Sequence, residues 1–572
     1  MAFNRDQLET GRLVWLLDIK IRGQTYRFST DVIDVSNTDT TVGPSILQYR
    51  GGLEFLEYED TVGLLDAEAS SREVSLSVLF ASGQEEGWAA ITDTARDIGS
   101  ATGELSLHLV GDDHKIRQVV IDGFLDSPSY GGVSEPVAFT LQESDHLDPL
   151  QFPPRWAVVN DDTWPLQTVG GARLYIDDAA REQAYPWVFG RPGTHPPLRW
   201  WGQDSDLFEA TPALLARIDQ TNKHNTTNAC KFVIAGHETT TETDVSSLSL
   251  PAGAVLLFSE SWLTPAGETP AIELDGEGNT ITTVTMTSSG PSDLHLVEPG
   301  QQVWVSWAGR GGVPNKDRTG PMIGAGEIIE YLLDQSGLRV DTLRARAVLG
   351  EVDGFALDFW INEPRSPMEI ITEDILPALP LSPQVRADGL AFVYWRWDAT
   401  AEDAIEAINL DQGFGDRAGP VEVSPISEVY NSMTIRYCQT GPDGSYRKEL
   451  TYAPENPDNL HNVVSNPYSW ASFTRYGLRQ GPVIEVPVIE RDDTARAVLD
   501  WRIRLHSQTR RSVSYRLPQK YQSLEPGDVV TVTDSEVAFD AAVCIVTGVI
   551  RAPGITEISF VTVPHWARDA LT

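Results

Sequence analysis

The sequence predicts a mainly β, multi-domain chain with a smaller share of α+β structure, and three observations lead to this fold class. A chain of 572 residues is too long for one hydrophobic core, and its 41% of hydrophobic residues are enough for several. Gly and Pro number 46 and 36, and aromatic and β-branched residues are plentiful, which is typical of strands joined by tight turns. Apolar and polar residues alternate near both ends of the chain, as they do in strands with one buried face.

Residues 1–148 are predicted to form a β-barrel domain. Every second residue is apolar in four runs, which are Leu13–Ile21, Val74–Phe80, Leu105–Leu109 and Val137–Leu141. One helix is expected within Gly87–Ile98, where three apolar residues share a helical face.

Residues 149–204 are predicted to be a Pro- and Trp-rich connector. Its run Tyr185–Gly193 combines two prolines with three aromatic residues, and we expect it to lie extended across a neighbouring domain, because a residue before proline avoids the helical region. Residues 205–318 contain short strands such as Lys231–Ala235 and Thr280–Met286 between Gly-rich turns, which predicts a β-sandwich-like insertion.

Residues 319–425 are predicted to form a small α+β module, because the apolar period changes to that of a helix. The apolar face of Ile328–Leu333 belongs to a helix that should end at Gly337. Ser366–Glu369 is a capping box with proline at the first helical position, and it should open a second helix.

A third helix is expected to begin at Thr400–Asp403 and to carry Ile405 and Ile408 on its apolar face. The run Leu390–Trp397 between the second and third helices has the pattern of a strand.

Residues 426–572 are predicted to form a second β-barrel domain. One helix, Thr494–Ser507, is expected among its strands. Pro526–Gly527 favours a type II turn, since glycine tolerates the positive φ that this turn needs, and Val297–Val305 has a similar sequence. The expected strands are Val429–Tyr437, Val483–Val488, Ser512–Leu517, Val529–Val532, Val543–Val546 and Ile558–Thr562.

The charge balance argues against a protein that grips nucleic acid. The chain has 43 basic and 82 acidic residues and a net charge of −39, whereas phosphate binding needs clustered Lys and Arg. Two compatible interpretations remain, which are solubility and an acidic surface past which DNA slides without sticking.

The cysteines and the apolar runs indicate a chain that folds in a reducing cytoplasm and has no membrane span. Cys230, Cys438 and Cys544 lie far apart without the spacing of a zinc site or a disulfide framework. No run approaches the ~20 apolar residues that a spanning helix needs. The N-terminal run Leu13–Leu17 is too short for a signal peptide and is interrupted by Asp18.

No catalytic, cofactor-binding or metal-binding residue is predicted, and each candidate has a structural interpretation that we prefer. His108 and His114 flank Asp112 and Asp113, which is compatible with a metal cluster but favours a polar hairpin tip. Glu57, Glu59 and Asp60 have the residue types of a glycosidase carboxylate pair. Among 82 acidic residues such proximity is expected by chance, and a solvated face is the preferred interpretation.

Two further candidates are weaker still. Gly324–Gly326 precedes a helix but lacks the third glycine of a dinucleotide-binding loop. The aromatic pairs Trp200–Trp201 and Tyr394–Trp395 are more typical of core or interface packing than of sugar stacking.

Five segments follow one another in the C-terminal part of the chain: Tyr476–Arg479, Ile484–Pro487, the helix Asp493–His506, Ser514–Pro518 and Leu524–Val530. In this order they resemble the closing domain of tail hub proteins from long-tailed phages and gene-transfer-agent-like particles. Glu428–Tyr437 is similar to the strand that enters that domain, and Tyr185–Gly193 is similar to a connector in the same group.

This resemblance implies a homotrimer in which two hub-type barrel domains per subunit make a six-fold-like ring. It also implies a structural role at the distal end of a phage tail, in the virion, with DNA present only as it passes through the channel. The implied partners are the distal tail protein, the tape-measure protein and tip or fibre proteins. A glycan- or receptor-binding tail adhesin, and less so a tail-associated hydrolase, remain as alternatives.

Overall fold

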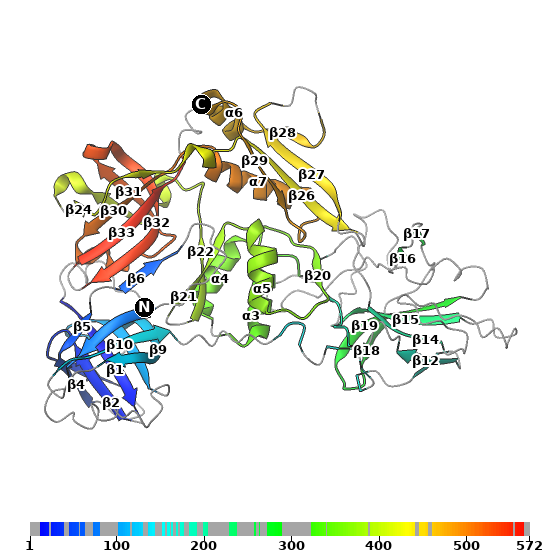
Figure 1. Ribbon diagram of the computed structural model, residues 1–572, viewed down its shortest axis with the longest axis horizontal. Coiled ribbons are helices and arrows are strands. Elements are labelled where there is room, and N and C mark those ends of the chain that lie inside the picture. Colours follow the sequence, from blue (N-terminus) through cyan, green and yellow to red (C-terminus); the bar gives the residue numbers. More distant parts are fainter. Residues whose placement is uncertain are drawn as a thin grey trace.

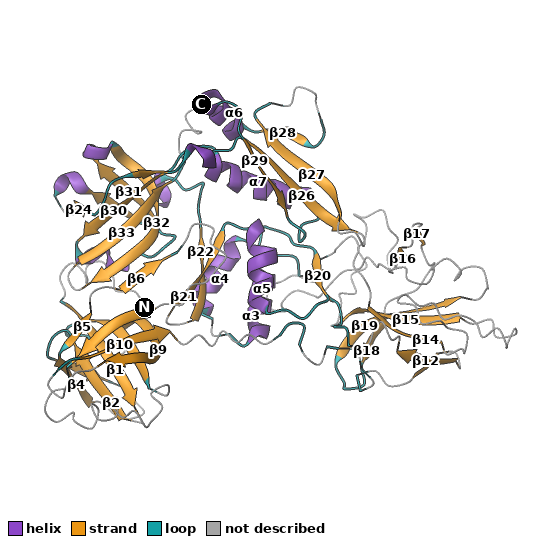
Figure 2. Cartoon of the chain, in the orientation of Figure 1, coloured by secondary structure: helices purple, strands orange, loops and turns teal. Residues whose placement is uncertain are grey.

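The computed structural model describes most of residues 12–143, apart chiefly from 63–72 and 80–100, then separate stretches between 151 and 288, and nearly all of 322–564. Strands predominate in these residues and form several sheets (Figures 1 and 2), which confirms the prediction of a mainly β, multi-domain chain. None of the helices in this part of the chain has the length and the apolar run that a bilayer crossing requires.

The N-terminal residues form a nine-stranded sheet with the order β3-β4-β2-β1-β8-β9-β10-β7-β5. β1 is buried on both faces, because Trp15 and Leu17 lie in the main core while Val14 and Leu16 pack beneath β3 and β4. The strands are β1 (Leu13–Ile21), β2 (Gln24–Ser29), β3 (Ile33–Asn37), β4 (Ser45–Gly51), β5 (Leu53–Phe55), β7 (Glu73–Val78), β8 (Thr102–Leu109), β9 (Arg117–Ser129) and β10 (Val137–Glu143).

This sheet agrees with the four alternating runs, but its pairings run from β3 to β5 and do not close into a ring among the described strands. The closed barrel therefore stays a prediction. The helix expected within Gly87–Ile98 lies outside the described residues.

A six-stranded sheet joins residues from both sides of the predicted boundary at 204/205. Its order is β11-β12-β14-β15-β19-β18, so strands expected in the connector and in the insertion belong to one sheet. The strands are β11 (Gln167–Val169), β12 (Ala172–Ile176), β14 (Leu198–Gln203), β15 (Asn228–Ala235), β18 (Ala271–Leu274) and β19 (Thr280–Ser288), and a separate pair is formed by β16 (Leu257–Phe258) and β17 (Trp262–Leu263).

One segment of the predicted connector lies on another domain, as expected. β13 (Trp187–Phe189) pairs antiparallel with β20 (Phe359–Ile361), and all three β13 residues are buried. Phe189 stacks on Phe359 with 5.2 Å between the ring centroids. The extended conformation predicted for Tyr185–Gly193 is thereby confirmed over its described part.

The α+β module contains the first two predicted helices. α3 (Ala325–Ser336) ends at Gly337, whose φ of 71° is the left-handed conformation expected of a glycine cap. Ser366 accepts a hydrogen bond from the Glu369 amide and begins α5 (Pro367–Glu369), which continues as η2 (Ile370–Ile375) and η3 (Leu376–Ala378). α4 (Thr342–Glu351) and the hairpin of β21 (Leu381–Arg386) and β22 (Gly389–Tyr394) complete the module.

The prediction of a third helix at Thr400–Asp403 is wrong beyond its cap. The capping box forms, but it holds only the short turn η4 (Ala401–Asp403). The chain then continues as β23 (Glu406–Asn409), which pairs parallel with β31 (Val529–Asp534). The pairing with a distant strand satisfies the backbone that a helix would otherwise have satisfied internally.

The C-terminal part contains two sheets, not one. The first has the order β28-β27-β26-β29 and shares a hydrophobic core with the α+β module through α7 (Asp492–His506). Its other elements are β26 (Ser432–Thr440), β27 (Ser445–Ala453), β28 (Val463–Ser465), α6 (Pro467–Tyr476) and β29 (Gln480–Glu485).

The second C-terminal sheet has the path β23-β31-β32-β33-β30-β24, and two further strands pair outside this path. Its core contains Tyr515, Val530, Val546 and Phe560, all fully buried. The strands not yet given are β24 (Asp416–Arg417), β25 (Glu422–Val423), β30 (Arg511–Leu517), β32 (Phe539–Ala552) and β33 (Ile555–Thr562).

Gly326 tests the packing of α3 on α4. A Cβ atom at this position would overlap the carbonyl oxygen of Leu349, which is backbone and cannot turn away. We expect Gly326→Ala to lower the free energy of unfolding by about 2–4 kcal/mol, measured by chemical denaturation. Gly350→Ala is the matched control, because Gly350 lies in α4 with open space around it and alanine should stabilise the helix by up to about 1 kcal/mol. Equal effects of the two substitutions would contradict the packing described.

Candidate assembly site

A short strand from the N-terminal part of the chain belongs to the second C-terminal sheet. β6 (Tyr58–Thr61) pairs antiparallel with β32, so that Thr61 lies opposite Gly548 and Tyr58 opposite Arg551. The next amide, that of Val62, donates to the carbonyl of Thr547 over 3.1 Å. Figure 1 shows this blue strand beside the red strands of the opposite chain end. The two ends of the polypeptide are therefore joined by backbone hydrogen bonds.

A buried apolar cluster lies at this junction and contains residues from four parts of the chain. Val62 is only 8% exposed and packs with Trp395 and Trp397 of the segment after β22, with Trp501 of α7 and with Ile545 of β32. The indole nitrogens of Trp395 and Trp501 donate to Ser382 Oγ and to the Ala378 carbonyl, over 2.9 and 3.2 Å. The indole N–H groups of Trp395 and Trp501 are therefore hydrogen-bonded although they are buried. The cluster joins the terminal domains to the α+β module.

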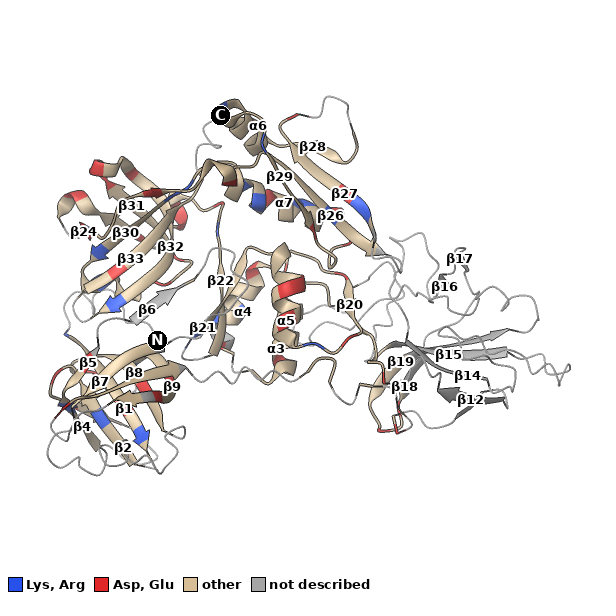
Figure 3. Ribbon diagram, in the orientation of Figure 1, with Lys and Arg blue, Asp and Glu red and all other residues tan. Residues whose placement is uncertain are grey.

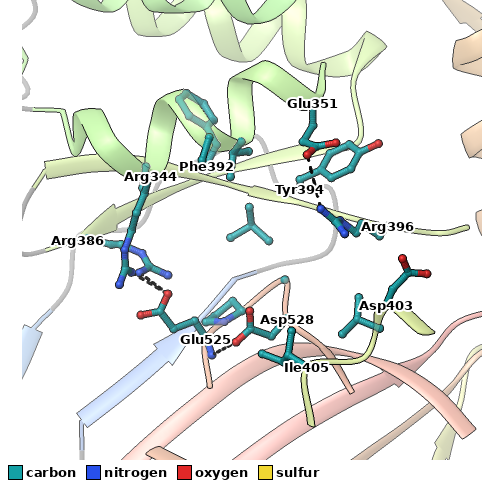
Figure 4. Close-up of a pocket in the computed structure, with 17 residues that line it drawn as sticks. Arg344, Glu351, Arg386, Phe392, Tyr394, Arg396, Asp403, Ile405, Glu525 and Asp528 are labelled. Atoms are coloured by element: carbon teal, nitrogen blue, oxygen red, sulfur yellow. Dashed lines mark hydrogen bonds and ion pairs between the residues drawn. The ribbon is translucent and has the colours of Figure 1, made fainter. Parts of the chain in front are cut away.

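An ion-pair clamp joins the second C-terminal sheet to the α+β module beside this cluster. The carboxylate of Glu525 accepts hydrogen bonds from Arg344 of α4 and Arg386 of β21, over 2.7 and 2.9 Å (Figure 4). Glu525 is presented by the turn before β31, in which Gly527 has a φ of 92° and the Asp528 amide donates to the Glu525 carbonyl. The predicted turn at Pro526–Gly527 is confirmed, and it positions the carboxylate between the two guanidinium groups.

The clamp borders a cleft of about 400 Å³ between α4, β22 and the turn before β31. Its lining mixes apolar residues such as Val348 and Ile405 with charged residues that pair among themselves, including Arg396 with Glu351 at 3.7 Å. The pKa of Asp528 is raised to about 6, mainly by burial and also by the charge of the nearby Glu525, while the hydrogen bond from the Glu525 amide and the charges of Arg344 and Arg551 act in the opposite direction. The residues described as lining the cleft include no Ser, Thr, Cys, Lys or His, and the cleft lies where the α+β module meets the second C-terminal sheet.

Residues 421–546 match a family model described as a putative phage tail protein. The resemblance of the C-terminal residues to phage tail proteins is confirmed. The matched residues include Glu525, α7 and the first part of β32. No curated protein matches the sequence.

Several solved structures align with much of the chain at low similarity. A 43 kDa tail protein of prophage MuSo2 from Shewanella oneidensis is 10% identical, with a TM-score of 0.36 over 97% of this chain and 100% of that chain. A tail protein from Neisseria meningitidis MC58 is 10% identical, with a TM-score of 0.31 over 97% and 99% of the two chains. A chain of the virion of a native gene transfer agent particle is 11% identical, with a TM-score of 0.40 over 70% of this chain and 89% of that chain.

Of the two histidines considered for a metal cluster, His114 lies in the turn between β8 and β9, and His108 lies near the end of β8, opposite Arg117. His114 Nε2 is 2.7 Å from the Tyr49 hydroxyl, and the His114 amide donates to the Ser36 carbonyl. Burial lowers the pKa of His114 to about 4. Asp113 accepts a hydrogen bond from the Thr38 amide, so the tip is tied to the segment that contains β3. Among the described residues no group of three or more His, Cys, Asp and Glu side chains is arranged to hold a metal.

The remaining candidates fall in structural positions where the structure describes them. Glu59 and Asp60 lie in β6, while Glu57 lies outside the described residues. Gly324 and Gly326 face Asp353 and Leu349, and an Asp353 carboxylate oxygen accepts from the Glu327 amide, which leaves no room for a phosphate at this helix start. Trp395 is buried and does not present a sugar-binding face, and Trp200 and Trp201 lie in β14.

Sequence reasoning missed the residues that form the junction. Glu525 lies 181 residues from Arg344 and 139 from Arg386, and no local pattern relates a carboxylate to arginines at such separations. Val62 follows a run rich in acidic residues that gives no strand pattern. The one available signal was the Pro526–Gly527 turn, which marks where the chain reverses but not what it contacts.

Val62 tests the strand addition. We expect Val62→Asp to lower the free energy of unfolding by about 2–4 kcal/mol, because it places a carboxylate in the apolar cluster. The control is Val32→Asp, since Val32 is 82% exposed in the same domain and its substitution should cost less than about 0.5 kcal/mol. Denaturation curves and the rate of proteolysis between the domains check both variants. A neutral Val62→Asp would show that this residue is not buried at the junction.

Glu525 tests the clamp. Glu525→Gln removes the charge between two arginines, one of which, Arg386, has a side chain only 12% exposed. We expect a loss of about 2–3 kcal/mol, since a partly buried cation is left without its counter-ion. Glu536→Gln serves as control, because Glu536 pairs with Arg417 at 2.6 Å but is 79% exposed, and such pairs contribute less than about 1 kcal/mol. Similar losses for the two variants, measured by urea denaturation, would refute a special role of the clamp.

Proposed function

We propose that this chain is a structural protein of a phage tail and that it acts in the virion as a trimeric tail hub. It would join the tail tube and the distal tail ring to the tip or fibres, with the distal tail protein, the tape-measure protein and tip or fibre proteins as partners. The family match of residues 421–546 supports the assignment to phage tails and to the virion. The hub role rests on the arrangement of the terminal domains.

The observation that carries this proposal is the pairing of β6 with β32. It attaches β6, which follows β5 of the N-terminal sheet in the chain, to the second C-terminal sheet by backbone hydrogen bonds (Figure 1). In a trimer, two such sheets from each of three copies would place six sheets around one axis. This number suits a protein that connects a six-fold ring to a three-fold tip. The two sheets of a subunit would have to keep their relative position, because domains that move independently would not hold six nearly equivalent positions around the trimer axis.

The charge of the chain fits a channel through which DNA passes. With a net charge of −39, a trimer repels the phosphate backbone wherever acidic residues face the lumen. We propose an acidic lining that keeps DNA mobile during ejection, and no enzymatic step is part of this function.

The proposal is tested by counting and locating the chain in purified particles. A small epitope tag at the C-terminus, imaged by cryo-electron microscopy with antibody fragments, should give three labels at the distal end of each tail, and untagged particles provide the background. The reconstructed channel should have a negative surface potential. One copy per tail, or a position on a side fibre, would overturn the hub role, and a basic lumen would overturn the acidic lining.

A further inference from the structure

β29 forms the edge of the first C-terminal sheet, and its outer side is a row of peptide groups. The sheet order ends at β29, which pairs in parallel with β26. The amide of Val486, the next residue, donates to the Arg436 carbonyl over 3.0 Å. Since inward and outward peptide groups alternate along a strand, Val483 and Glu485 direct their N–H and C=O groups away from β26. Among the described strands, none pairs with this side.

Exposed apolar side chains accompany this edge. Leu478 is 60% exposed and Val483 is 47% exposed, whereas Ile484 packs against the core on the other face of the strand. Ile426 is 50% exposed, and the guanidinium of Arg479 donates to its carbonyl, so Ile426 lies near the residue that precedes β29. We call the β29 edge together with Ile426, Leu478 and Val483 the β29 surface.

The charge distribution indicates which partner suits the β29 surface. Residues 421–572 contain 15 Lys and Arg and 18 Asp and Glu, so their net charge is −3, and residues 1–420 carry the remaining −36 of the total of −39. Figure 3 shows both basic and acidic residues on α7, which agrees with the small net charge of this part of the chain. Two copies of so acidic a chain repel each other least through the nearly neutral part. A basic partner would instead favour the acidic part.

An unpaired parallel edge with exposed apolar residues is a template for an added strand. We propose that the β29 surface pairs with a strand of a second copy of this chain, so that the sheet continues from one subunit into the next. In a closed ring the contact is head-to-tail, so the added strand comes from another part of the neighbour's residues 421–572 and not from its β29. This inference rests on the proposed homotrimer and names the surface that builds it.

Val483→Pro tests the edge with little disturbance of the subunit. Proline removes the outward N–H of Val483 but none of the hydrogen bonds to β26, and it keeps an apolar side chain. Val483→Thr is the matched control, since it keeps the N–H and the β-branched shape. We expect Val483→Pro to raise the concentration at which the full-length chain dissociates by at least about tenfold, because each contact loses a hydrogen bond, while Val483→Thr stays within about threefold. Mass photometry over a dilution series measures both.

Hydrogen exchange gives a second readout. The amides of residues 480–486 should be more protected at concentrations where the wild-type chain is assembled than where it is dissociated. Protection that does not depend on concentration would mean that another part of the same subunit covers the edge, and it would overturn the proposal. A wild-type trimer whose dissociation is unchanged by Val483→Pro would overturn the β29 surface and leave the hub proposal standing. A wild-type chain that stays monomeric and is present singly in particles would overturn both.

Discussion

The addition of β6 to β32 is the interaction on which the arrangement of the molecule depends. It pairs residues 58–61 with residues 548–551, so nearly the whole chain lies between the two strands. Ordering so distant a contact costs loop-closure entropy, although this cost grows only slowly with length. A four-residue pairing alone would not offset it, and the burial of Val62 with Trp395 and Trp501 provides the remaining stabilisation. The strand pairing sets the orientation of β6 on β32, and the burial of the apolar cluster stabilises the junction.

The clamp at Glu525 adds specificity to the same junction. An ion pair at the boundary between domains contributes modestly to stability, because the Coulomb attraction is offset by the loss of hydration. Its geometry is nevertheless selective, since one carboxylate has to reach Arg344 on a helix and Arg386 on a strand at once. A shift between the second C-terminal sheet and the α+β module would break both hydrogen bonds. The structure therefore fixes the relation between these units by a polar contact and an apolar one that lie side by side.

A phage tail component needs rigid subunits whose remaining surfaces are free to bind neighbours. The internal edges here are used within the chain: β13 covers β20, β23 covers β31 and β6 covers β32. The β29 edge, by contrast, has no described strand beside it and lies in the part of the chain with little net charge. Within one subunit, strand addition between distant segments joins the domains, and the same physics would join subunits where an edge is left available.

The sequence by itself determined the elements whose signals are local. Alternation identified the strands at Leu13–Ile21 and Leu105–Leu109, the Gly337 cap ended α3, and proline and glycine gave the turn at Pro526–Gly527, because each depends on residues adjacent in the chain. Only the tertiary structure decided that the chain after Thr400 becomes β23 and that Glu525 meets Arg344. β23 is a strand because it pairs with β31, and Glu525 forms its ion pair because the fold brings Arg344 close across 181 residues. No periodicity within either segment of the sequence identifies these distant partners.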